Sequence, residues 1–355
     1  MLHFSIIMND IIKIFNKTSD SVFIIAELSA NHNQDKDLAI ETIKAAKRAG
    51  ANAVKLQTYR PDTITIDCDN EYFQINHGTI WDGKTLYDLY RESYTPWEWH
   101  EELFEVAKNE GLICFSSPFD KTAVDFLENL YCPIYKIASP EITDIALIEY
   151  VASKGKPVIL STGISRLEDI ELAVNTIRAT GNDQIAILKC TSEYPASPED
   201  ANLLTIKNIA ETFEVISGLS DHTLGIEAPI VAVTLGAKII EKHLILNKSI
   251  GGPDAFFSLD FDEFSDMVKS IRITEKLLGK INYSLSLKIE KIRQKGARSL
   301  FVVKDIIAGE IITEVNVRSI RPGYGLHPKF YNKILGKTAK TDIEKGTPLT
   351  WDHIC

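Results

Sequence analysis

Val22-Phe23-Ile24-Ile25-Ala26 is an unbroken run of apolar, largely β-branched residues, which is typical of a strand buried on both faces. Seven further runs of this kind follow, and an amphipathic helical segment separates each from the next. The predicted strands are Val22–Ala26, Ala53–Gln57, Leu112–Ser116, Ile134–Ala138, Pro157–Ser161, Ile185–Cys190, Glu214–Gly218 and Ala237–Glu241. Strands that alternate with helices in this way form a parallel sheet.

The number of strand–helix units selects between two α/β folds. An open doubly wound sheet also fits the periodicity, but eight units over about 260 residues favour a closed TIM (β/α)8 barrel. We predict a leader at residues 1–20, the barrel at 21–280, a linker at 281–297 and a small β-rich domain at 298–355. In that domain Asp305–Glu310 recurs as Asp342–Thr347, and each copy has the glycine turn of a β-hairpin.

Composition excludes several functional classes. The formal net charge of −10 argues against a nucleic-acid or anionic-membrane partner. Five cysteines without paired spacing favour a reducing compartment over a disulfide framework. The apolar pieces within residues 4–15 are interrupted by polar residues, so they form neither a signal peptide nor a membrane span. The sequence therefore predicts a cytoplasmic protein.

One connection is unusually long. Thr58–Tyr94, between the second predicted strand and the next large helix, is rich in aromatic and polar residues. A loop of this length inside a compact domain is usually a lid or a binding element, although a tolerated surface insertion is the alternative.

Polar residues end or follow all eight predicted strands. In a TIM barrel the carboxyl ends of the strands carry the active site. The candidate site residues in these positions are Glu27, Lys55, Gln57, Ser117, Lys136, Ser139, Ser161, Ser192, Tyr194, Ser220, His222 and His243. Packing alone does not explain polar residues at the same end of every strand.

Two of these residues are lysines within strands. A buried lysine is unfavourable unless it is paired with an anion. Lys55 and Lys136 would form a phosphate and carboxylate cradle with the neighbouring hydroxyls of Ser117, Ser139, Ser161, Ser192 and Ser220. The alternatives are that each lysine pairs with a local carboxylate, or that one forms a Schiff base as in class I aldolases.

Two histidines end adjacent strands. His222 and His243 are placed to share an octahedral divalent ion acting as a Lewis acid on a carbonyl, with hydrogen-bonded structural histidines as the alternative. Asp254, just past the eighth strand, is either a substrate ligand or a turn residue. Arg321 lies in a glycine- and proline-rich loop of the small domain and, taken alone, is a solvated turn residue.

Several stretches resemble the sialic acid synthase family, in the family's order and over nearly the whole chain. They are Ile25–Asn33, Lys55–Thr58, Tyr135–Ser139, Gly218–Thr223 and Glu241–His243. The Arg321–Pro328 loop falls in a segment similar to that family's C-terminal antifreeze-like (SAF) domain. Glu27–His32, Gly78–Gly83 and Arg321–Pro328 look more like the pseudaminic acid synthase branch than the N-acetylneuraminate branch.

The resemblance implies a transferase that condenses phosphoenolpyruvate with 2,4-diacetamido-2,4,6-trideoxy-altrose to form pseudaminic acid and phosphate. Precursors of N-acetylneuraminic or legionaminic acid are alternative sugars. A Schiff-base sialic-acid lyase and a carbohydrate-binding protein are alternatives of other classes.

The resemblance also assigns roles to residues. His222 and His243 would hold Mn²⁺, with Mg²⁺ or Co²⁺ as alternatives, and Glu27 would exchange a proton with water or stabilise a cationic centre. Lys55, Lys136 and the serines would hold phosphoenolpyruvate. The sugar site would be lined by Gln57, Tyr194 and Asp254. A domain-swapped homodimer is implied, in which Arg321 reaches the partner's site.

Overall fold

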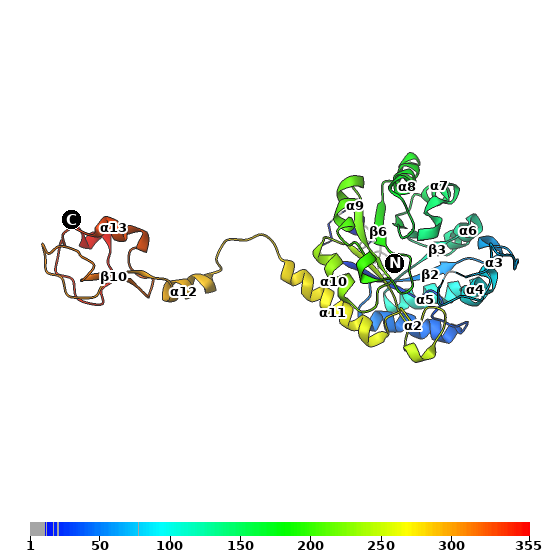
Figure 1. Ribbon diagram of the computed structural model, residues 1–355, viewed down its shortest axis with the longest axis horizontal. Helices are drawn as coiled ribbons and strands as arrows, with labels where there is room; N and C mark the ends of the chain where they lie inside the picture. The colour runs from blue at the N-terminus through cyan, green and yellow to red at the C-terminus, as the bar shows by residue number, and fades with distance from the viewer. Residues whose placement is uncertain (1–10, 12, 17, 20, 77) are drawn as a thin grey trace. The chain divides into compact units, whose positions relative to one another are not determined.

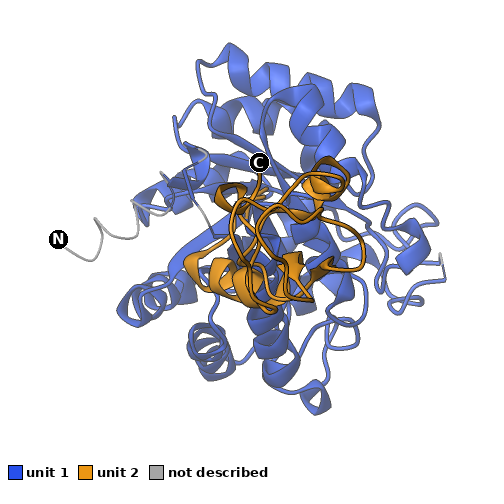
Figure 2. Cartoon of the chain, turned by 90° about the vertical axis from the view of Figure 1, so that its left-hand side faces the viewer, with its two compact units in different colours: residues 1–279 blue, residues 280–355 orange. Residues whose placement is uncertain are grey.

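The computed structural model describes residues 11, 13–16, 18, 19, 21–76 and 78–355, which form two compact units, 1–279 and 280–355 (Figure 2). The leader expected at residues 1–20 lies largely outside the described residues. In the first unit, eight parallel strands pair in chain order and close because β1 also pairs with β8 (Figure 1). The strands are β1 Phe23–Glu27, β2 Ala53–Thr58, β3 Ile113–Pro118, β4 Tyr135–Ile137, β5 Val158–Ser161, β6 Ile185–Cys190, β7 Ile216–Asp221 and β8 Ile239–His243.

Barrel closure confirms the predicted TIM fold and rules out the open doubly wound sheet. Helices surround the strands, as Figure 1 shows. They are α2 Lys36–Ala49, α3 Pro61–Ile64, α4 Leu86–Ser93, α5 His100–Glu110, α6 Lys121–Asn129, α7 Ile145–Ala152, α8 Leu167–Ala179, α9 Thr205–Phe213, α10 Glu227–Thr234 and α11 Phe261–Leu278. Within the described part of the chain, none of the helices has both the length and the apolar character needed to cross a bilayer.

Local sequence signals set the helix ends. At α2, the Asp35 carboxylate accepts hydrogen bonds from the backbone N–H groups of Asp37 and Leu38, which have no partner inside the helix. The helix ends at Gly50, whose φ of 94° is readily adopted only by glycine. Such caps fix where each helix returns the chain to the barrel.

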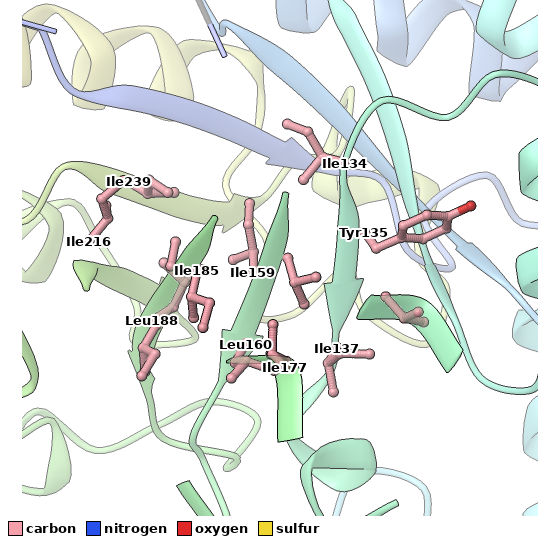
Figure 3. Packing of buried hydrophobic residues seen from close by; sticks show 14 of the residues in the cluster. Ile134, Tyr135, Ile137, Ile159, Leu160, Ile177, Ile185, Leu188, Ile216 and Ile239 are labelled. Atoms are coloured by element: carbon pink, nitrogen blue, oxygen red, sulfur yellow. The ribbon is translucent and has the colours of Figure 1, made fainter. Parts of the chain in front are cut away.

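The alternation of side chains along β1 separates residues of two buried apolar clusters. In β1, Phe23 and Ile25 belong to one buried cluster, whereas Ile24 and Ala26 belong to the other. Figure 3 shows part of the first cluster, with Ile159 of β5 and Ile185 of β6 among its members. Apolar side chains therefore fill most of the barrel interior. At the carboxyl ends of the strands, the inward-pointing positions are occupied by polar side chains instead.

The long connection after β2 is more ordered than a loop. It contains the short helix α3 and the helix α4, and a β-bridge joins Gln74 to Thr85. Trp81 Nε1 donates a hydrogen bond to the carbonyl oxygen of Pro253, 3.2 Å away in the loop after β8. The connection is thus attached to the carboxyl-end face of the barrel.

The second unit begins with α12 Leu287–Gly296, which occupies most of the segment expected to be a linker. It also contains α13 Tyr331–Ile334 and an antiparallel pair, β9 Ser299–Val302 and β10 Val317–Ile320. The two sequence copies at 305–310 and 342–347 pair with each other, because Ile306 and Ile343 exchange two backbone hydrogen bonds of 2.9 and 2.8 Å. The repeat therefore marks two mutually bonded segments.

One buried ion pair joins the ends of β7 and β8 on the side facing away from the barrel interior. Lys242 Nζ donates to Asp221 Oδ2 and to the carbonyl of Thr223, and the Lys242 side chain is fully buried. Asp221 also accepts hydrogen bonds from the backbone N–H and the hydroxyl of Thr223. Because Asp221 precedes His222 and Lys242 precedes His243, this pair fixes the two histidines relative to each other.

We expect Lys242→Met to lower the free energy of unfolding by about 3–5 kcal/mol, because it leaves the Asp221 carboxylate buried without its cation. Urea unfolding measures the change. The matched control is Lys269→Met, which breaks an exposed ion pair with Asp266 and should change stability by less than about 1 kcal/mol. Equal, small effects of the two substitutions would contradict this account.

Candidate active site

A cavity of about 360 Å³ opens at the carboxyl end of the barrel. Each of the eight strands, or the residues directly after it, contributes at least one residue to its lining. Lys55, Gln57, Lys136, Ser139, Ser161, Tyr194, Ser220, His222, His243 and Asp254 are lining residues. The structure therefore brings together most of the side chains that the sequence analysis selected.

Three charged residues, Lys55, Lys136 and Glu241, line the floor of the cavity, and Glu27, which is not itself a lining residue, extends this network of alternating charges through Lys55. Lys55 Nζ lies 2.6 Å from Glu27 Oε2 and 3.6 Å from Glu241 Oε1, and Lys136 Nζ lies 3.4 Å from the same Glu241 oxygen. All four side chains are at least 95% buried. Both lysines thus face the same space, as predicted. Each already has a carboxylate partner, so the net charge of the floor is closer to zero than that of the predicted cradle of two unpaired cations.

The two carboxyls of this network titrate differently. Burial raises the pKa of Glu27 above its ordinary value, and the charge of Lys55 offsets only part of that effect. Burial would raise the pKa of Glu241 as well, but Lys136 and Lys55 outweigh it and lower the pKa to about 2. Glu241 is therefore a fixed anion, whereas Glu27 is suited to gaining and losing a proton.

Hydroxyl groups surround these charges. Ser117 accepts a hydrogen bond from Lys55 Nζ at 3.4 Å, and Ser220 donates to Glu241 at 2.9 Å. Ser139 accepts from the backbone N–H of Gly163 at 2.9 Å, and a Cβ on Gly163 would lie 2.0 Å from Ser192 Oγ. The Ser161 hydroxyl is buried and has no hydrogen-bond partner, so it is available to a ligand.

The two histidines lie side by side, with ring centroids 5.3 Å apart. His222 Nδ1 lies 2.9 Å from the carbonyl of Thr191, an acceptor that would place the proton on Nδ1 and leave Nε2 free as a ligand. Burial and the neighbouring His222 hold the pKa of His243 well below its usual range, so its ring is neutral. His243 Nδ1 is buried and has no hydrogen-bond partner.

These donors fit an open divalent-metal site. The described residues contain no group of three or more histidine, cysteine, aspartate or glutamate side chains arranged to hold a metal ion. Two imidazoles would leave the remaining positions of a bound divalent ion to water and substrate, which is the arrangement of an open metal site.

Aromatic rings enclose the imidazoles. Tyr194 lies 4.4 Å from His222 and 5.5 Å from Trp81 between ring centroids, and Phe257 lies 4.9 Å from His243. Asp254 Oδ2 is 3.7 Å from His243 Nδ1 and accepts a hydrogen bond from the backbone N–H of Ala30. Asp254 is thus a buried neighbour of the histidines as well as a lining residue.

Among the carboxyl and thiol groups that line the cavity, three were not selected from the sequence. Glu241 was noted at the end of its strand, but its pairing with both lysines depends on barrel closure. Glu141 lies two residues after Ser139 in a short 3-10 helix, and its Oε2 is buried without a hydrogen-bond partner. Cys190 ends β6 with its Sγ 3.8 Å from His222 Nδ1. Side chains alternate along a strand, and Cys190 in β6 and Glu241 in β8 occupy inward-pointing positions. This alternation could have identified both residues from the sequence.

Arg321 belongs to the second unit and is not among the residues that line this cavity. Its loop is firmly held, because Ser299 Oγ donates to the carbonyl of Pro322 and accepts from the backbone N–H of Gly325. The supply of Arg321 to a partner's site stays a prediction.

The closed barrel and its charged cavity define a TIM-barrel enzyme. Residues 42–283 match the NeuB family, and residues 297–354 match the SAF domain. The chain belongs to the NeuB family.

Relatives extend this similarity over nearly the full chain. The chain is 50% identical to the pseudaminic acid synthase of Helicobacter pylori, over 93% of this chain and 97% of that protein. It is 49% identical to the pseudaminic acid synthase of Campylobacter jejuni strain 81-176, over 94% and 96%. The crystal structure of the spore coat polysaccharide biosynthesis protein SpsE of Bacillus subtilis is 36% identical, with a TM-score of 0.63, over 94% and 95% of the two chains.

Glu141 generates a pH-dependent prediction. Burial raises its pKa from 4.5 to about 7, so the unfolded chain releases this proton at a lower pH than the folded one. The stability that the neutral carboxyl contributes is fully present below pH 4.5 and is lost as the pH rises through about 7. Glu141→Gln removes this loss.

We therefore expect Glu141→Gln to gain on the order of 3 kcal/mol in unfolding free energy over wild type between pH 4.5 and pH 8. Denaturant unfolding of both proteins at the two pH values measures the gain. A stability difference that is the same at both pH values would show that the Glu141 carboxyl ionises normally in the folded protein.

Proposed function

We propose that this chain is a pseudaminic acid synthase, condensing phosphoenolpyruvate with 2,4-diacetamido-2,4,6-trideoxy-altrose to form pseudaminic acid and phosphate. The observation that carries the proposal is one cavity lined by two lysines, the Glu241 carboxyl and two adjacent imidazoles, with a second carboxyl of higher pKa, Glu27, paired to Lys55. Identity of 50% to a pseudaminic acid synthase over 93% of the chain supports the choice of sugar.

Phosphoenolpyruvate would lie over the charged floor. Lys55 and Lys136 would donate to its phosphate and carboxylate, with the lining hydroxyls of Ser139, Ser161 and Ser220 as neutral donors. Ser117 and Ser192 do not line the cavity, and Ser117 would act by accepting a hydrogen bond from Lys55. Glu241 would hold both ammonium groups in place rather than contact the anion, because it already lies within 3.6 Å of each. The phosphate would leave from donors that are already oriented.

The sugar would occupy the side of the cavity lined by Gln57, Tyr194 and Asp254. His222 and His243 would hold a divalent cation such as Mn²⁺, which supplies Lewis-acid polarisation of the sugar's aldehyde oxygen when it is bound. The aromatic rings of Tyr194 and Phe257 limit the access of water to this corner.

The reaction balances as follows. The methylene carbon of phosphoenolpyruvate forms a bond to the aldehyde carbon, whose oxygen takes up a proton. The electrons of the C2=C3 double bond form that new bond and leave a cationic C2, to which water adds with loss of one proton. The bond between C2 and the phosphate oxygen then breaks as the C2 hydroxyl becomes the ketone and passes its proton to the departing phosphate. Glu27 is placed to move the proton of that water, because its pKa is raised and its Oε1 is fixed by the backbone N–H of Ser29 at 2.9 Å.

We expect wild-type protein with Mn²⁺ to release phosphate from phosphoenolpyruvate and the diacetamido sugar, and Lys136→Ala to lower kcat on the order of 10²-fold or more. Lys156→Ala is the control, because Lys156 pairs with Glu128 outside the cavity. A near-normal rate for Lys136→Ala would overturn the assignment of the floor, and a lysine adduct trapped by borohydride with pyruvate would favour the Schiff-base lyase.

We also propose a domain-swapped homodimer in which Arg321 completes the partner's site. Large apolar side chains are exposed around the start of the second unit, including Ile281 at 93% and Tyr283 at 94% in the single chain. Exposed apolar groups in such number favour contact with another surface. Arg321 would then contact the N-acyl groups of the sugar or the developing carboxylate.

Co-expression of Lys136→Ala with Arg321→Ala tests the swap, because each variant alone should be inactive. If Arg321 acts across subunits, random pairing makes half of the dimers mixed, each with one intact site, and restores about a quarter of wild-type activity. Activity no higher than that of the separate variants would place Arg321 in its own subunit's site, or outside any site.

A further inference from the structure

The cavity extends beyond the charged floor into a recess walled by the long connection after β2. We call this recess the annex, and define it by Ile64, Ile75, Leu86, Leu89, Tyr90 and Ser93, all of which line the cavity. Leu86, Leu89, Tyr90 and Ser93 are spaced i, i+3, i+4 and i+7 in α4, so one face of this helix forms a wall. The length of the connection predicts a lid or a binding element, but its sequence indicates no particular ligand.

The annex is held in shape before any ligand binds. Ile75 N–H donates to the carbonyl of Lys84 at 2.9 Å, and Leu86 N–H donates to the carbonyl of Phe73 at 2.8 Å. The ring of Tyr90 packs edge-on against Tyr59, with centroids 5.8 Å apart. A preorganised wall of this kind selects among ligands instead of adapting to them.

Two polar atoms facing this part of the cavity lack partners. Ser93 Oγ and Glu141 Oε2 are buried, and neither makes a hydrogen bond. Both residues line the same cavity. Burial raises the pKa of Tyr90 on the α4 wall, and the charge of Glu141 adds to that shift. Buried polar atoms are nearly always hydrogen-bonded, so these two indicate a ligand that supplies both a donor and an acceptor.

An acylamino group has the matching chemistry. Its methyl group is apolar, its N–H is a donor and its carbonyl oxygen is an acceptor. A phosphate or carboxylate does not match, because none of the six residues that define the annex is cationic. A hydroxyl alone would leave the apolar wall uncovered.

We propose that the annex binds the second acylamino group of the sugar, the group that a mono-N-acylated hexosamine lacks. The methyl group packs against Ile75 and Leu89, the N–H donates to Glu141 Oε2, and Ser93 Oγ donates to the carbonyl oxygen. The inference rests on the proposed function and assigns sugar selection to the connection after β2. A site that hydrogen-bonds a substrate group discriminates strongly against the analogue without it.

The test measures phosphate release with Ser93→Ala, Ser93→Leu and wild type, varying the diacetamido sugar and phosphoenolpyruvate separately. Ser93→Ala should raise KM for the sugar about tenfold and leave kcat within about twofold, because the lost hydrogen bond is present before and during the reaction. Ser93→Leu also obstructs the recess, and we expect a rise in sugar KM of about 100-fold. KM for phosphoenolpyruvate should stay within about twofold of the wild-type value in both variants.

Arg91→Ala is the matched control. Arg91 lies in the same helix, but its side chain is 64% exposed and pairs with Asp88. This variant should leave both KM values unchanged. If the substitutions disturbed α4 as a whole, Arg91→Ala would also change KM for the sugar, or KM for phosphoenolpyruvate would rise together with KM for the sugar.

A second comparison uses wild type with 2-acetamido-2,6-dideoxyhexose of the same ring configuration. We expect its kcat/KM to be at least about 10²-fold lower than that of the diacetamido sugar. Comparable use of both sugars, or unchanged sugar KM in Ser93→Ala and Ser93→Leu, would overturn the annex assignment and leave the proposed function intact. Absence of phosphate release from wild type with every sugar would overturn both.

Discussion

Barrel closure places four buried charges around one small space, and the rest of the candidate site depends on how they balance. Isolated in an apolar interior, each of Glu27, Lys55, Lys136 and Glu241 would be unfavourable, but in alternation each charge has a partner within 3.6 Å. Glu241, held at low pKa between two lysines, stabilises both of them. Glu27 has only Lys55 as a close cationic partner and keeps the raised pKa of a buried acid. One network therefore supplies both a fixed anion and a titratable group.

Apolar packing and a second buried ion pair hold the strands that carry these charges. The apolar layer below fills the barrel, and the Asp221–Lys242 pair on the outer side joins the strands that carry His222 and His243. The connection after β2 adds a preformed wall on one side of the cavity. The chemistry and the sugar selection that we propose thus fall to different segments: the strand ends for the first, and the connection after β2 for the second.

Sequence alone determined the fold class and most of the candidate site, because both depend on periodicity. Continuous apolar runs at β1 to β8 predicted the barrel, and the observed β1, β7 and β8 extend one to three residues further, since Glu27, Asp221 and His243 continue the strand with polar side chains. Lys55 and Gln57 could be assigned to one face by simple alternation.

Only the tertiary structure decided which charges meet. Glu241 is 105 residues from Lys136 in the chain, and their contact follows from closure of the sheet, which no local pattern encodes. Likewise, no local pattern predicts that Ser93 and Glu141 line one cavity, because these residues are distant in sequence and meet only in the folded barrel. Local spacing fixes the direction of a side chain, whereas its partners and pKa depend on burial and on segments distant in sequence.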